Sequence, residues 1–168
     1  TPKASNDRFL WAGKFAHDLK PNTIICMGDF ASMDSLSSYD KGKKSFEGRR
    51  YKKDIDHVHD ALEKFNKGLN GRRSRKIMLL GNHEDRIDRT VDEIPELEGT
   101  ISTDDFKFEK FGWEVHEYQK PVVVDGVYYC HNYPTGVMGK PISGDNVARS
   151  LLIKNKVSST VGHIHTFD

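Results

Sequence analysis

The chain has 168 residues, of which 36% are hydrophobic and 30% are charged, and its net charge at pH 7 is +1. This composition fits one domain of ordinary size over residues 1–168, and no apolar run is long enough to span a bilayer. We therefore expect no membrane partner, and in the absence of a visible secretory signal we place the protein in the cytoplasm by default. The composition leaves the oligomeric state open.

The hydrophobic pattern predicts helices that alternate with strands, which indicates an α/β fold. Asp125-Gly126 stands between two apolar runs and is typical of a hairpin turn. No repeat, linker or low-complexity tract supports a second domain. In chain order the expected elements are a helix over 5–19, a strand over 23–28, a helix over about 50–68, a strand over 75–80, a mixed helical stretch over 88–111, strands over 113–118, 121–125 and 127–131, a helix over about 143–154 and a strand over 157–161.

Polar motifs follow four of the predicted strands, and we expect their side chains to converge on one edge of a sheet. An anionic carboxylate such as that of Asp29 can bridge two divalent cations, while imidazoles and an amide oxygen complete each coordination shell. The glycines that precede Asp29, Asn82 and His163 suit sharp turns where the backbone approaches an ion closely. The motifs are Gly28-Asp29, Gly81-Asn82-His83-Glu84, His131 and Gly162-His163-Ile164-His165.

In this order, the motifs resemble the calcineurin-like metallophosphoesterase family, whose pattern is Asp-x-His, Gly-Asp, Gly-Asn-His-Asp/Glu, His and Gly-His-x-His. The resemblance implies a metallophosphoesterase-type layered αββα sandwich. It also implies that one metal ion is bound by Asp29, Asn82, His131 and His163, and that a second is bound by Asp29 and His165. His83 is then catalytic, because in the family the matching histidine faces the scissile phosphate and stabilises the transition state or protonates the departing alkoxide.

The Asp-x-His block of the family is absent from this chain. Residues 1–22 contain His17 and Asp18, but these stand in a pattern with helical spacing rather than at the end of a strand. Either the chain lacks its true beginning or the protein has lost half of a metal site, and we expect truncation. The chain also stops three residues after His165, where the family continues. The sandwich is therefore expected to lack its first strand and its C-terminal strands.

The mixed nitrogen and oxygen ligands suit manganese, with iron, zinc or nickel as alternatives, so the expected cofactors are two divalent metal ions. Cys26 and Cys130 lie inside apolar strands. We interpret them as buried thiols in a reducing compartment rather than as a disulfide, and a ligand role for either is the alternative.

A basic segment over residues 41–53 has seven Lys or Arg residues and one acidic residue, and a shorter one covers 72–76. The first is interpreted as a binding surface for a polyanion, with Phe46 and Tyr51 available to stack on bases. A solvated loop that leads into a helix is the alternative. The candidate substrate-binding residues are Arg49, Arg50, Lys52 and Lys53.

Three further residues near the motifs have both a functional and a structural interpretation. Asp34 would orient His83, and Arg86 and Arg89 would contact phosphate oxygens. Capping of loops and pairing with Asp85 or Asp88 explain the same residues equally well.

These features predict a metal-dependent hydrolase of phosphoric esters. We expect a phosphodiesterase that acts on nucleic acid or nucleotides through water activated by two metal ions. The branch of protein Ser/Thr phosphatases has an arginine where this chain has Leu80. The alternatives are a phosphomonoesterase and a non-catalytic binding scaffold that retains the fold.

Overall fold

The computed structural model describes residues 5–135, 137, 139–144 and 146–165. The two chain ends, on which the expectation of truncation rests, lie outside these residues.

The first sheet is parallel and consists of β1 (Thr23–Cys26), β2 (Arg75–Leu79) and β3 (Glu114–His116), in that order. Ile25 is in register with Ile77, and Met78 is in register with Val115. These strands confirm the predictions over 23–28, 75–80 and 113–118, and each is shorter than predicted.

The second sheet consists of β4 (Val122–Val124), β5 (Val127–Cys130) and β8 (Ser159–Val161), in the order β4-β5-β8. β4 and β5 form the predicted antiparallel hairpin, and both turn residues have positive φ angles, 50° at Asp125 and 79° at Gly126. β8 is parallel to β5. The four polar motifs therefore follow strands of two sheets, so the prediction of one sheet edge was wrong: the chain changes sheets between β3 and β4.

The helices are α1 (Asp7–Leu19), α2 (Tyr51–Leu69), α3 (Arg86–Glu93) and α4 (Val147–Asn155). The predicted helices over 5–19 and 50–68 agree with α1 and α2. α4 begins four residues later than the helix predicted over 143–154. The expected opening turn of that helix includes Asp145, which lies outside the described residues. Among the described helices, none is long and apolar enough to cross a membrane.

The short elements were less predictable. The stretch predicted as mixed helical over 88–111 contains α3 and three short 3-10 helices: Pro95–Leu97, Thr103–Phe106 and Phe108–Phe111. The long loop after β1 contains 3-10 helices at Asp34–Leu36, Ser38–Asp40 and Lys44–Phe46, and β6 (Pro134–Thr135) pairs with β7 (Lys140–Pro141).

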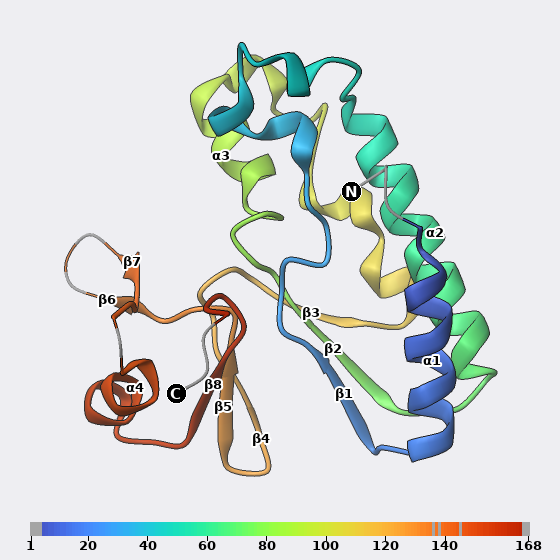
Figure 1. Ribbon diagram of the computed structural model, residues 1–168, viewed down its shortest axis with the longest axis vertical. Coiled ribbons are helices and arrows are strands. Elements are labelled where there is room, and N and C mark those ends of the chain that lie inside the picture. The colour runs from blue at the N-terminus through green and yellow to red at the C-terminus, as the bar shows by residue number, and fades with distance from the viewer. Residues whose placement is uncertain (1–4, 136, 138, 145, 166–168) are drawn as a thin grey trace.

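Successive side chains along β1 and β2 point to opposite faces of the first sheet, and each face packs into a separate hydrophobic core. Ile24 and Met78 face the helices, where α2 contributes a stripe of buried apolar residues at helical spacing. Ile25 and Ile77 point the other way and pack against the second sheet. A third cluster joins β8 to α4. Figure 1 shows the resulting order of two helices, a sheet, a second sheet and a helix, which is a mixed α/β architecture.

The helices α1 and α2 touch through two glycines. A Cβ atom at Gly13 would collide with the carbonyl oxygen of Phe65 and would lie 2.9 Å from the nitrogen of Leu69. A Cβ atom at Gly68 would meet the backbone of α1 in the same way. The backbones of α1 and α2 can therefore touch only because glycine, which has no side chain, stands at both positions.

Gly13→Ala should destabilise the protein although alanine favours a helix. The forced separation of α1 from α2 should cost about 1–3 kcal/mol, which exceeds the helix propensity gain of about 1 kcal/mol. Unfolding in urea would measure the change, and Lys14→Ala on the exposed side of α1 is the control, with an expected change below about 0.5 kcal/mol. Equal or greater stability of Gly13→Ala would contradict this packing.

Candidate metal centre

The imidazole of His131 connects the two sheets. His131 directly follows β5, its exposed fraction is 1%, and its Nδ1 lies 2.7 Å from the carbonyl oxygen of Met27, which directly follows β1. Gly28 has a φ angle of 94°, and a Cβ atom there would collide with the ring of His131. The close approach of the two sheets at this point therefore explains the glycine before Asp29.

Four side chains that were predicted to bind one metal ion meet at His131. Its Nε2 lies 3.0 Å from Asn82 Oδ1, 3.2 Å from His163 Nδ1 and 3.5 Å from Asp29 Oδ2. The potential ligand atoms of Asp29, His131 and His163 all lie within 4.8 Å of one another. The loops after β1, β2 and β8 carry three of these residues to the region between the sheets (Figure 1).

The donor atoms of this group fit a cation. The carbonyl oxygen of Met27 can only accept a hydrogen bond, so Nδ1 of His131 carries a proton, and Nε2 is the ring nitrogen that would present its lone pair to a cation. Nε2 faces the oxygens of Asn82 and Asp29, which could coordinate the same ion. Carboxylate, amide and imidazole ligands suit manganese, iron, nickel or zinc.

His163 is also ready to act as a ligand, because burial lowers the pKa of its imidazole and keeps the ring neutral at pH 7. The nearby His131 acts in the same direction, and Asp29 opposes it. A Cβ atom at Gly162, the residue before His163, would lie 2.5 Å from the Met27 oxygen, so this glycine too is explained by the close approach of the sheets.

Asp29 has a left-handed backbone, with a φ angle of 53°. This conformation costs about 1–3 kcal/mol at a residue other than glycine, although aspartate tolerates it better than most. The conformation lets Oδ1 accept a hydrogen bond from the backbone N–H of His83 at 3.1 Å, while Oδ2 faces His131. A Cβ atom at Gly81 would collide with Oδ1 of Asp29, which accounts for the glycine before Asn82.

The two remaining predicted histidines lie outside this group of donor atoms. His83 Nε2 is 4.0 Å from Asp29 Oδ2, and its side chain is 33% exposed. Burial lowers the pKa of His83, and Asp29 counteracts this. His165 is exposed, and the second metal site expected from Asp29 and His165 stays a prediction.

Sequence reasoning assigned no role to Glu84, which proves to support the site. Its carboxylate is fully buried and accepts backbone hydrogen bonds from Asp29 at 3.0 Å, Ala31 at 2.6 Å and Gly81 at 2.7 Å. Burial raises the pKa of Glu84 to about 7, and the hydrogen bonds counteract this. Glu84 therefore holds the loop after β1 against the loop after β2. Its position in the Gly-Asn-His-Glu block is the one signal that marked it in the sequence.

The predicted polyanion-binding residues contact the protein itself. Arg49 donates to Asp40 at 2.8 Å and to the Asp34 carbonyl at 3.0 Å, and it lowers the pKa of Asp40. Arg50 donates to the Arg49 carbonyl. Lys52 pairs with Asp56 at 3.0 Å and Lys53 lies 3.5 Å from the Gly48 carbonyl. The hollow beside these cations is also lined by acidic residues: Asp34, Glu47, Asp54, Asp56 and Asp60. A role in substrate binding stays a prediction for all four.

The aromatic residues of this region differ from the expectation. The hydroxyl of Tyr51 donates to Asp105 at 2.7 Å and its ring packs against the core, so it is not free to stack on a base. The guanidinium of Arg49 covers Phe46 at 5.5 Å from the ring centre. Tyr39, which the sequence did not single out, is 82% exposed.

Arg86 and Arg89 both bind the backbone near the site. Arg86 donates to the Ser32 carbonyl at 2.8 Å, and Arg89 donates to the Asn82 carbonyl at 2.8 Å and pairs with Asp85 at 3.0 Å. These are the contacts that loop capping and pairing with Asp85 predicted. No hydrogen bond joins Asp34 to His83 in the described part of the chain, where Asp34 acts on the imidazole by charge and raises its pKa.

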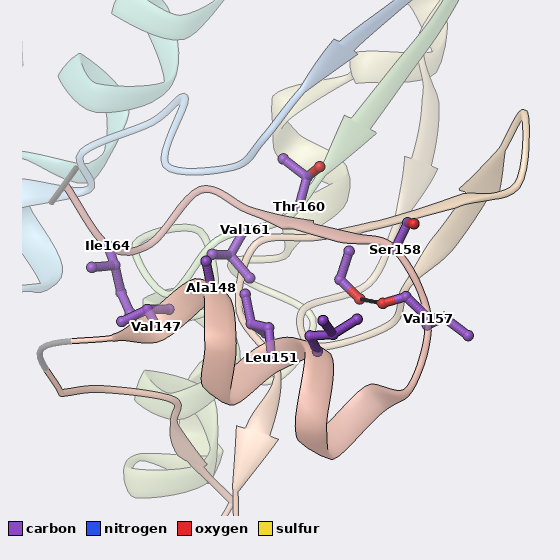
Figure 2. Close-up of a pocket in the computed structure, with 10 residues that line it drawn as sticks. Val147, Ala148, Leu151, Val157, Ser158, Thr160, Val161 and Ile164 are labelled. Atoms are coloured by element: carbon purple, nitrogen blue, oxygen red, sulfur yellow. Dashed lines mark hydrogen bonds between the residues drawn. The ribbon is translucent and has the colours of Figure 1, made fainter. Parts of the chain in front are cut away.

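The cysteines and the hollow beside α4 lie outside the donor group of Asp29, His131 and His163. Cys26 and Cys130 are both free thiols, as expected, and burial raises the pKa of each, to about 12 for Cys26, so both are protonated. A hollow of about 460 Å³ lies between α4 and β8. Figure 2 shows Val161 and Leu151, which both belong to one apolar cluster, among the residues that line this hollow. Its lining contains aliphatic, serine and threonine residues and no metal-binding side chain.

No protein-family model matches this chain, and no similar protein is found among curated proteins or among solved structures.

Glu84→Gln should destabilise the protein by roughly 1–3 kcal/mol. Both carboxylate oxygens accept backbone N–H groups, and the glutamine amide would turn its own N–H₂ toward at least one of these donors. Glu63→Gln on the exposed face of α2 is the matched control, with little expected change. Urea unfolding of both variants would measure the difference, and equal stability would contradict the role of Glu84.

Proposed function

We propose that this protein is a divalent-metal-dependent hydrolase of phosphoric esters, with the layered αββα fold of the calcineurin-like metallophosphoesterases. The grouping of Asp29, His131 and His163 around Asn82 is the observation that carries the proposal. The order of the motifs in the sequence supports it. We further propose that the ester is a phosphodiester of a nucleotide or nucleic acid.

The four donor residues would hold the metal ion. When bound there, a divalent ion would supply Lewis-acid chemistry that activates water and offsets charge on the phosphate oxygens. Asp29 and Asn82 contribute oxygen ligands, and His131 and His163 contribute nitrogens. The hydrogen bond from His131 to Met27 occupies Nδ1, so Nε2 is the ring nitrogen that would bind an ion. Whether Asp29 bridges to a second ion with His165 stays a prediction, as do manganese as the metal and a cytoplasmic location.

In this proposal His83 stabilises the transition state or protonates the departing oxygen. Its backbone N–H is anchored on Asp29, so its ring stands beside the metal ligands without belonging to them. A third of its side chain is exposed, which leaves the ring accessible to a substrate. A positioned general acid contributes about 100-fold or more to the rate of such a reaction.

Metal content and turnover should separate the roles of these residues. Asp29→Asn and His163→Ala should abolish metal binding and activity, whereas His83→Ala should retain the metal and lose about 100-fold or more in kcat. Elemental analysis and hydrolysis of bis(p-nitrophenyl) phosphate with Mn²⁺ would measure both, and removal of the metal by a chelator should stop the reaction. His17→Ala, on the exposed part of α1, is the control.

Two results would contradict the proposal. Equal metal loss in His83→Ala and Asp29→Asn would show that the division of roles is wrong. Failure of the metal-loaded, unaltered chain to cleave either the diester or p-nitrophenyl phosphate would exclude the hydrolase and leave a binding scaffold. Preference for the monoester would instead assign a phosphomonoesterase.

A further inference from the structure

A small hollow of about 150 Å³ adjoins the candidate metal centre between α3 and the loop that follows β1. Asn82 belongs both to this lining and to the group around His131. A ligand in the hollow would therefore lie beside the metal ligands. The complete lining is Leu36, Ser37, Ser38, Tyr39, Lys41, Asn82, Arg86, Arg89, Thr90 and Glu93.

The charge of the hollow favours an anion. Lys41, Arg86 and Arg89 stand against one acidic residue of the lining, Glu93, and Asp85 outside the lining pairs with Arg89 at 3.0 Å. The two arginines are held in place by the backbone carbonyls of Ser32 and Asn82, and a guanidinium has five N–H donors, so each keeps donors for a ligand. Lys41 is exposed, and its ammonium has no partner in the described part of the chain.

The same lining contains an exposed aromatic ring. The side chain of Tyr39 is 82% exposed, and the ammonium of Lys43 lies 3.7 Å from the ring centre. Lys43 in turn lies 3.6 Å from Asp40, which keeps this cation beside the ring. An accessible ring among cations is the arrangement by which proteins bind single-stranded nucleic acids, because bases stack on the ring and phosphates pair with the cations.

We propose that this hollow binds the nucleotide next to the scissile phosphate of a single-stranded nucleic acid. The base stacks on Tyr39, and the neighbouring phosphate pairs with Lys41 and Arg89. The inference rests on the proposed function for the position of the scissile phosphate, but the binding surface itself needs no metal ion. It also places the aromatic contact at Tyr39, in the loop before the basic residues Arg49 to Lys53, where Tyr51 is already bonded to Asp105.

Binding of a labelled single-stranded oligonucleotide of about ten nucleotides, measured by fluorescence anisotropy in EDTA, tests the surface apart from catalysis. Tyr39→Ala should weaken binding about tenfold, whereas Tyr39→Phe, which keeps the ring, should bind as the unaltered chain does. Lys41→Gln should reduce the slope of log K against log salt by about 0.7, because one phosphate contact is lost. Phe15→Ala on the exposed side of α1 and Lys20→Gln directly after the helix are the matched controls.

Kinetics with Mn²⁺ on the same oligonucleotide complete the test. Tyr39→Ala should raise KM about tenfold and change kcat by less than about twofold, because the ring touches a base rather than the reacting atoms. Equal binding by the unaltered chain and Tyr39→Ala would overturn the inference, as would binding of a blunt duplex as tight as that of the single strand. Tyr39-dependent binding without hydrolysis of any ester would support the surface and refute the proposed function, so the two failures can be told apart.

Discussion

The arrangement of this molecule depends on the buried imidazole of His131. The ring belongs to the second sheet, yet Nδ1 binds the carbonyl at the end of β1 and Nε2 faces Asn82, which follows β2. The backbone carbonyl of His131 also accepts the N–H groups of Gly162 and His163, after β8. One residue thus joins the ends of strands from both sheets, and the side chains that follow those strands meet as a consequence.

The residues around His131 allow the two sheets to approach closely, and this has a local cost in stability. Three glycines leave room where a Cβ atom would collide with the ring, with Asp29 or with Met27, and Asp29 itself adopts a left-handed backbone. Glu84 offsets part of that cost, because its buried carboxylate binds the N–H groups of both loops. Backbone strain beside converging potential ligand atoms is typical of a site that binds a cation. The residues that hold the two sheets together are therefore the same residues that form the proposed site.

Periodic features of the sequence were predictable, whereas contacts between distant segments were not. Helical spacing identified α1 and α2, and the turn residues Asp125-Gly126 identified the hairpin, because each signal is local. The division into two sheets was missed, since strand pairing depends on packing between residues far apart in the chain. For the same reason the sequence does not reveal the hydrogen bond that occupies Tyr51 at Asp105, and it gives no signal for the exposed Tyr39, which lies in a loop without periodicity.

We propose that a divalent ion binds among Asp29, His131 and His163, and NMR of isotope-labelled histidine rings during titration with Zn²⁺ is the sharpest test. We expect the Nε2 signal of His131 and the Nδ1 signal of His163 to shift together and saturate, while the proton on Nδ1 of His131 stays in place. Unchanged signals from both rings at saturating Zn²⁺, or shifts confined to surface histidines such as His17, would contradict it.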